Sequence, residues 1–288
     1  MTLPKQWNWK WISGTFALLA MGVLIQWRTW REIWNIACSD EESSQIFLVP
    51  LIAAYLIWVR RGRFRRITPR PSWIGPSLVA FGAFVNYYGQ SHAYISLEQI
   101  GAVLIAIGCV VTVLGRQFIE AFLPALMVLA FLVPAPASFR QNISIPLERV
   151  TASVTQDLFD VLGIAVQRSG NLLSINGVDV TIAEACNGLR MVFALFLVSY
   201  LFAFSVPLRN YVRLIVIAAS PLSAILCNVV RLIPTVWLYG HSSQETAEIF
   251  HDVSGWIMLP LAFALLVCII RSMRWALLPI YPFTLSRE

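Results

Sequence analysis

Residues 97–114 of the chain read LEQIGAVLIAIGCVVTVL, and Glu98 is their only charged residue. At a rise of about 1.5 Å per residue, an α-helix of this length is about 27 Å long. That length is at the short end of what crosses a hydrocarbon layer roughly 30 Å thick, so tilt or local thinning is expected. The stretch therefore predicts a membrane-spanning helix.

The rest of the chain has a similar composition. Of its 288 residues, 58% are hydrophobic and 12% are charged, and the mean hydropathy is +0.71. These values exclude a soluble enzyme and a disordered chain. Three of the five cysteines, Cys109, Cys227 and Cys268, lie inside apolar runs. This scattered arrangement excludes a disulfide framework and leaves the redox compartment open.

The apolar windows predict an all-α, polytopic integral membrane protein with about eight transmembrane helices. We expect one membrane domain over residues 1–288, with five N-terminal spans in 11–134, an extracytoplasmic segment over 135–185, three C-terminal spans in 186–270 and a cytoplasmic tail over 271–288. The eight candidate spans lie near residues 11–27, 44–59, 74–90, 97–114, 118–134, 188–206, 211–233 and 253–270.

The basic residues orient these spans. With both termini in the cytoplasm, 14 of the 21 lysines and arginines fall on the cytoplasmic side, as the positive-inside rule requires. Six of them share one short loop: Arg60, Arg61, Arg63, Arg65, Arg66 and Arg70. The formal charge of +6 thus indicates orientation against a membrane leaflet rather than a nucleic-acid partner.

Residues 145–166 are also apolar, with Leu147, Val150, Val154 and Leu158 at helical spacing. As a span, this segment would place Asp157 and Asp160 near the middle of the bilayer, at roughly 2.5 to 3.5 kcal/mol each. We expect instead an interfacial or partly re-entrant helix on the outer surface that ends near Gly170.

Asn176-Gly177 follows this segment, between Leu173-Ser174-Ile175 and Val178-Asp179-Val180. An Asn-Gly pair between alternating residues favours a β-hairpin with a type I′ turn, because both turn residues need positive φ. We therefore expect a short hairpin before the sixth span.

Cys186 lies in the sequence Glu184-Ala185-Cys186-Asn187-Gly188-Leu189-Arg190, at the expected start of the sixth span. A thiol at a helix N-terminus is favoured as the thiolate, the form that attacks a carbonyl carbon. The alternative roles are those of a small packing residue or one half of a disulfide with Cys38.

Arg231 lies near the outer end of the seventh expected span, in Asn228-Val229-Val230-Arg231-Leu232-Ile233-Pro234. A permanent charge in an apolar span is a candidate functional residue, although it could also reach the lipid headgroups. Arg190 would raise the positive potential near Cys186 or anchor the helix at the interface.

His251 immediately precedes the eighth expected span, in Phe250-His251-Asp252-Val253-Ser254-Gly255-Trp256. An imidazole there could exchange a proton with a thiol, although a lone loop histidine is often without such a role. His92 and His241 are expected in solvated loops. In the predicted orientation Cys186, Arg231 and His251 share the outer membrane face.

Other chemistries lack their usual motifs. The chain has no His-Glu-x-x-His, Gly-x-Ser-x-Gly, Cys-x-x-Cys or Walker phosphate loop. We therefore expect no metal and no cofactor.

The ordered set Glu184 to Arg190, Asn228-x-x-Arg231 and His251-x-x-x-Gly255-Trp256 resembles the exosortase/archaeosortase family, as does the turn Pro134-Ala135-Pro136. The informative part runs from about Phe131 to Leu266. One departure is Asn187, where many members have Ser or Thr after the cysteine.

The resemblance implies a multi-pass cysteine protease or transpeptidase of the cell (inner) membrane, with Cys186 as nucleophile and with Arg231 and His251 completing an extracytoplasmic active site. It implies as partners secreted proteins with a C-terminal transmembrane sorting signal of the PEP-CTERM type, membrane lipid, and a lipid or glycan as acceptor. The alternative from another class is a transporter for anions, or a scaffold in envelope polysaccharide export, with Arg190 and Arg231 lining a path.

Overall fold

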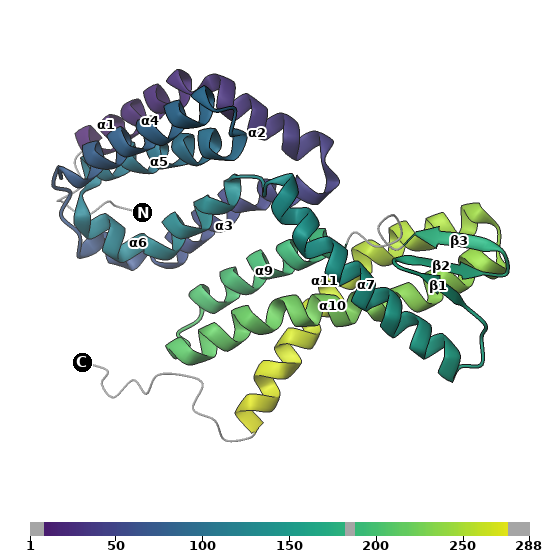
Figure 1. Cartoon of the computed structure of the whole chain (residues 1–288). Coiled ribbons are helices and arrows are strands. Elements are labelled where there is room, and N and C mark those ends of the chain that lie inside the picture. The colour runs from purple at the N-terminus through teal and green to yellow at the C-terminus, as the bar shows by residue number, and fades with distance from the viewer. Residues whose placement is uncertain (1–8, 182–187, 276–288) are drawn as a thin grey trace. The chain divides into compact units, whose positions relative to one another are not determined.

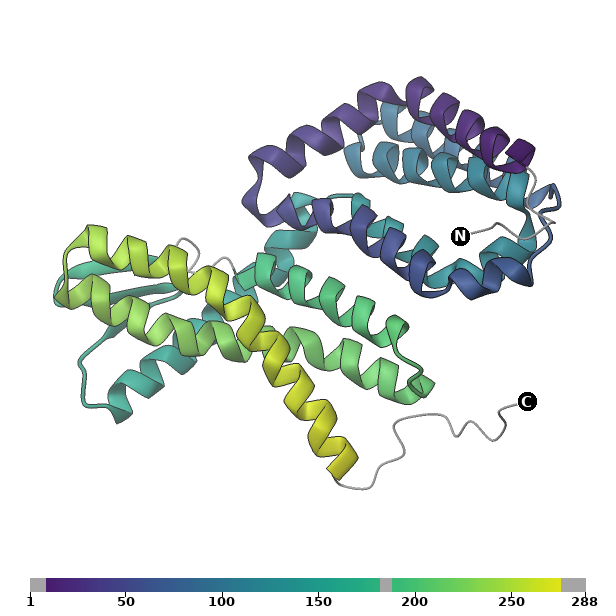
Figure 2. The same cartoon turned by 180° about the vertical axis from the view of Figure 1, so that it is seen from behind.

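Figures 1 and 2 show a computed structural model of the chain, which describes residues 9–181 and 188–275. It is mostly helical and forms two compact units, Met1–Pro136 and Ala137–Glu288. The boundary falls at the expected start of the extracytoplasmic segment. That the whole chain forms one membrane domain stays a prediction.

The N-terminal unit consists of helices. In chain order they are α1 (Trp9–Ile25), α2 (Trp27–Ser39), the 3-10 helix η1 (Glu41–Phe47), α3 (Leu48–Val59), η2 (Arg61–Arg65), α4 (Ile74–Ser91), α5 (Ile95–Leu114), α6 (Arg116–Val128) and η3 (Leu129–Leu132).

Helix α2 has no counterpart among the expected spans. It follows a break at Gln26, whose φ of −99° and ψ of 23° are not helical. One face carries Trp27, Trp30 and Trp34, while Arg28 and Glu32 form an ion pair. This amphipathic pattern is typical of a helix at an interface, so a search for apolar windows passes over it.

Helices α4 and α5 pack with their backbones close together. A Cβ atom built on Gly101 would lie 2.6 Å from the backbone nitrogen of Asn86, and one on Gly108 would lie 2.9 Å from that of Val79. Small residues allow such an approach between apolar helices, where dispersion contacts supply much of the attraction.

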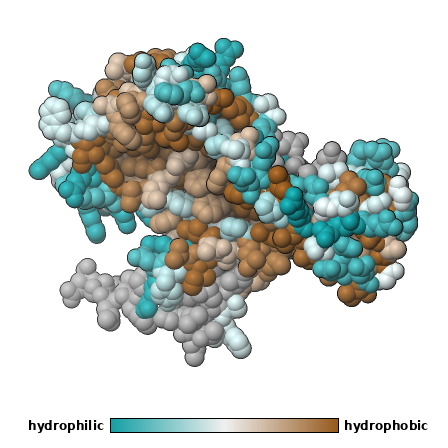
Figure 3. All heavy atoms as spheres, viewed as in Figure 1, coloured by the Kyte–Doolittle hydropathy of each residue, from teal (hydrophilic) through white to brown (hydrophobic). Residues whose placement is uncertain are grey.

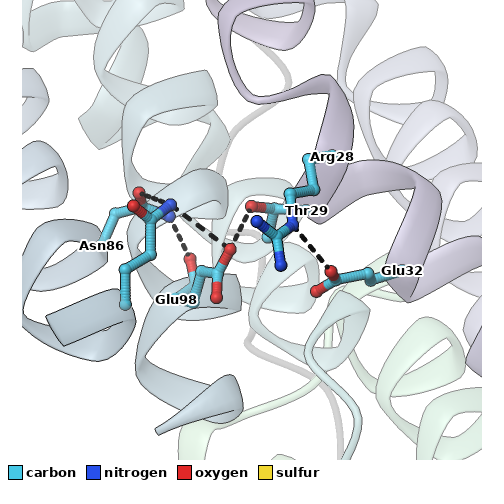
Figure 4. A network of polar contacts seen from close by, with 6 residues as sticks. Arg28, Thr29, Glu32, Asn86 and Glu98 are labelled. Carbon is cyan, nitrogen blue, oxygen red and sulfur yellow. Dashed lines mark hydrogen bonds and ion pairs between the residues drawn. The ribbon is translucent and has the colours of Figure 1, made fainter. Parts of the chain in front are cut away.

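A polar network ties α2 to this helix pair (Figure 4). Glu98 is only 9% exposed, and its Oε1 accepts a hydrogen bond of 3.0 Å from Thr29 Oγ1 and one of 3.4 Å from Gln90 Nε2. Asn86 Nδ2 donates to the backbone carbonyl of Glu98 at 2.8 Å. The carboxyl group thus links three helices through uncharged donors.

The C-terminal unit combines helices with a small sheet. Its elements are α7 (Ala137–Val161), β1 (Gln167–Ser169), β2 (Leu172–Ile175), β3 (Val178–Thr181), α9 (Gly188–Ser205), α10 (Asn210–His241) and α11 (Gln244–Trp275).

The expected end of the 145–166 helix near Gly170 is wrong. Helix α7 ends at Val161, and Gly163, two residues later, has a φ of +72°. The N–H of Gly163 donates to the Asp160 carbonyl, and that of Ile164 donates to the Phe159 carbonyl. This pair of bonds is a Schellman motif, which satisfies carbonyls at a helix end. Gly163, seven residues before Gly170, was therefore the better stop signal.

The predicted hairpin is confirmed. Strands β2 and β3 pair antiparallel, and Asn176 and Gly177 have φ values of 52° and 78°, as a type I′ turn requires. A strand that was not predicted, β1, pairs with β2 across Gly170 and Asn171. Its three residues are all exposed, so no alternation of apolar residues marked it.

The sheet packs on the last turns of α10. Leu173 and Val180 form one core with Phe159 of α7 and with Leu232 and Val236 of α10. This packing explains why α10 continues to His241, past Pro234, where a helix end was expected. His241 is consequently the last residue of α10 rather than a loop residue.

By length and composition, α5 and α10 are long and apolar enough to cross a membrane, among the residues described. Shorter apolar helices cover Trp9–Ile25, Ser43–Val59 and Leu189–Ser205. The protein is thus an all-α membrane protein with a small sheet. The number of eight spans and the positions of the termini stay predictions.

Candidate active site

Arg231 lies on α10 and faces α11. Its side chain is almost fully buried, with the residue 4% exposed. Nε donates a hydrogen bond of 3.0 Å to Ser254 Oγ, and Nη2 donates one of 3.0 Å to the backbone carbonyl oxygen of His251. A buried guanidinium is tolerated only when such bonds replace its hydration. The two bonds join α10 and α11 and hold the plane of the guanidinium in one orientation.

The hydrogen bonds of Arg231 connect to a further bond within α11. Ser254 Oγ donates to the same His251 carbonyl oxygen at 3.0 Å, so this oxygen accepts from both side chains. The carbonyl of Arg231 in turn accepts from Thr235 Oγ1 at 2.8 Å. Ser254 was not singled out from the sequence, although it lies three residues after His251 and hence on the same helical face.

Gly255 lies against the flat side of this guanidinium. A Cβ atom built on Gly255 would be 3.5 Å from Nη2 and 3.6 Å from Cζ of Arg231, which is ordinary van der Waals contact. A methyl group at this position would therefore fit beside the guanidinium.

The sequence suggested that His251 is a loop residue, but it lies in a helix. Helix α11 begins at Gln244, so His251 is in its second turn, and the side chain is half-buried. Ser243 supplies the missing start signal, because its Oγ accepts a hydrogen bond of 3.3 Å from the N–H of Thr246. A serine three residues before the bonded N–H is a typical N-cap. His251 and Arg231 are thereby held on two packed helices.

Helix α9 packs against both of these helices. Met191 and Leu195 of α9 share a core with Ala224 and Cys227 of α10 and with Ala262 of α11. Cys227 is one helical turn before Arg231, and Met191 is in the first turn of α9. The first turn of α9, which includes half-buried Arg190, therefore packs against α10 and α11.

Cys186 and its neighbours 182–187 lie outside the described residues. In the sequence Cys186 comes two residues before Gly188, the first residue of α9. Cys38 is an exposed free cysteine of the N-terminal unit, and the alternative of a disulfide between Cys38 and Cys186 stays a prediction.

His241 and His92 have other contacts. Asn176 Nδ2 lies 3.2 Å from His241 Nε2 and 3.1 Å from the Gly240 carbonyl, so His241 holds the tip of the hairpin. The ring of His92 stacks on Tyr88 at 4.2 Å. Over residues 9–181 and 188–275, no three His, Cys, Asp or Glu side chains gather as metal ligands would.

The chain was compared with protein-family models, with curated proteins and with solved structures. A family model described as transmembrane exosortase (Exosortase_EpsH) matches residues 30–268, which is most of the chain and includes every candidate residue. No curated protein and no solved structure matches the chain.

Proposed function

The chain belongs to the transmembrane exosortase family, and on this premise we propose that it is a membrane cysteine protease or transpeptidase. Its substrates would be secreted proteins with a C-terminal transmembrane sorting signal. The observation that carries the proposal is the buried guanidinium of Arg231, bonded to Ser254 and to the carbonyl of His251. These bonds bring two of the three candidate catalytic residues together.

In the proposed reaction the thiolate of Cys186 attacks the carbonyl carbon of the scissile peptide bond. Arg231 donates a hydrogen bond to the oxyanion that forms, and an oriented donor of this kind stabilises a transition state because it needs little rearrangement. As the C–N bond breaks, His251 gives a proton to the departing amine, and a thioester remains on Cys186.

The second half of the reaction restores the enzyme. An amine or hydroxyl group of a lipid or glycan, or else water, attacks the thioester while His251 accepts its proton. The new bond forms to the substrate carbonyl carbon, and the sulfur leaves as the thiolate. Transfer to a lipid or glycan would be transpeptidation or its ester equivalent, and transfer to water would be hydrolysis.

The lengths of α10 and α11 support a site at a membrane boundary. Each helix has 32 residues and is about 48 Å long, which exceeds a hydrocarbon layer of roughly 30 Å. Arg231 is about 32 Å along the axis from Asn210, where α10 begins. If the end of α10 at Asn210 faces the cytoplasm, Arg231 would lie near the outer boundary of the membrane. The motif of a membrane-anchored substrate would stop at the same boundary.

The test is the mass of a substrate's new C-terminus in cells that carry the intact protein or Cys186→Ala. We expect truncation only with the intact protein, and a truncated product with added mass would mean transfer to an acceptor. Cys227→Ala is the matched control, because Cys227 is a buried thiol one turn from Arg231. Normal processing by Cys186→Ala would overturn the proposal.

A further inference from the structure

The N-terminal unit contains an apolar cavity of about 610 Å³. Its walls come from α1, α2, α5, α6 and η3, with Val23, Ala106, Val110 and Leu126 among the lining residues. In Figure 3, hydrophobic surface covers the hollow between α5 and α6. An apolar cavity of this kind offers water too few hydrogen-bond partners to hold it in place.

Helix α2 adds polar groups to the wall of this cavity. Trp27, Trp30, Arg31 and Trp34 all line it. Arg31 is exposed and forms no ion pair with any residue that the structure describes, whereas the neighbouring Arg28 pairs with Glu32 at 3.2 Å. The indole nitrogen of Trp30 is shielded and also has no hydrogen-bond acceptor within the described part of the chain. A cation and a donor without partners beside an apolar cavity indicate a ligand with an apolar chain and an anionic head.

The volume of the cavity, about 610 Å³, lies within the usual range of about 300 to 1,000 Å³ for sites that bind small molecules. One acyl chain is a ligand of this size class, and Arg31 in the wall favours an anionic head group.

We propose that this cavity binds one acyl chain of an anionic phospholipid, whose phosphate pairs with Arg31. The tryptophans then contact the glycerol region, where the amphipathic rings of Trp residues are enriched in membranes. The predicted orientation makes this a lipid of the outer leaflet, because α2 follows the first span. The site involves the N-terminal unit alone and does not rest on the proposed peptidase activity.

The test titrates the full-length protein in detergent with phosphatidylglycerol or phosphatidylcholine and counts bound lipids by native mass spectrometry. We expect one phosphatidylglycerol to be retained more strongly than phosphatidylcholine. Arg31→Ala should lower retention of phosphatidylglycerol about fivefold, the change that corresponds to roughly 1 kcal/mol for one basic residue near anionic lipid. Ala106→Phe, which fills the cavity, should lower retention of both lipids.

Arg28→Ala is the matched control, because Arg28 is on the same helix but does not line the cavity. Equal losses in Arg28→Ala and Arg31→Ala would mean general attraction to the helix surface and would overturn the site. Unchanged retention in Arg31→Ala would overturn it as well. Displacement of the lipid by a peptide with the sequence of a sorting-signal helix, in proportion to its concentration, would assign the cavity to the substrate instead.

Discussion

In the N-terminal unit the carboxyl group of Glu98 lies between α2, α4 and α5, whereas in the C-terminal unit the guanidinium of Arg231 lies between α10 and α11. Both groups are buried, and both form hydrogen bonds to a neighbouring helix. Glu98 accepts from the side chains of Thr29 and Gln90, neither of which is a candidate for chemistry. Arg231 donates to the backbone carbonyl of His251, and His251 is a candidate catalytic residue.

The difference teaches that burial of a charge does not by itself identify a catalytic residue. Ionisable groups inside a membrane protein are functional candidates by default, yet the surroundings of Glu98 are those of a clasp between closely packed helices. Arg231 is buried as well, but it donates to the backbone carbonyl of His251, a candidate catalytic residue. Substitutions near Glu98 in the N-terminal unit should therefore change stability, whereas substitutions near Arg231 in the C-terminal unit should change activity.

The largest effect on activity, after removal of the nucleophile, is expected for His251→Ala. Loss of a general acid and base lowers rates about 10²- to 10⁴-fold. The control is His92→Ala in the N-terminal unit, since His92 stacks on Tyr88 at a helix end and should not affect processing. Rates of substrate truncation by the two variants measure the difference. Equal rates would remove His251 from the mechanism.

Arg231→Lys is expected to lower turnover about 10²- to 10³-fold, as loss of an oriented oxyanion donor does in other enzymes. An ammonium group cannot reproduce the planar fork that reaches Ser254 and the His251 carbonyl together. Glu98→Gln should leave turnover nearly unchanged, because an amide oxygen can still accept from Thr29. Truncation rates and thermal unfolding of both purified variants provide the measurement. Near-normal turnover by Arg231→Lys would make Arg231 a structural clasp like Glu98.

Gly101→Ala should change stability rather than chemistry. The added methyl group would lie 2.6 Å from the backbone of Asn86, and overpacking of this kind costs about 1 to 3 kcal/mol. Gly14→Ala is the matched helical control, because a Cβ atom there has nothing within 4 Å. The measurement is the unfolding midpoint of each variant in the same detergent. A Gly101→Ala protein as stable as Gly14→Ala would contradict the close approach of α4 and α5.

The smallest effect is expected for Asn176→Ala, at about 1 kcal/mol of unfolding free energy. The change removes the hydrogen bonds to Gly240 and His241 and places alanine at a φ of 52°. Asn35→Ala, on an exposed part of α2, is the control. Denaturant titration followed by circular dichroism detects the shift. No difference between the two variants would mean that the hairpin tip does not stabilise α10.

Sequence patterns predicted the features that depend on neighbouring residues. The turn at Asn176-Gly177 was predictable because only a few residue types adopt positive φ at low cost. The apolar helices were predictable from composition, and Arg231 stood out as a charge in an apolar run. Five features were not predicted correctly: helix α2, the end of α7, the end of α10, the start of α11 and strand β1. The sheet stabilises the end of α10, and the N-cap at Ser243 was overlooked beside the stronger apolar signal.

By itself the sequence determined that this chain is an apolar, helical membrane protein with a hairpin before its last three helices, because composition and turn chemistry are local properties. Tertiary structure alone decided that Ser254 and the carbonyl of His251 bind Arg231, and that Arg31 lies beside an apolar cavity with no ion-pair partner among the described residues. Both outcomes depend on the register between packed helices, which is set by the sum of many small contacts rather than by any one residue.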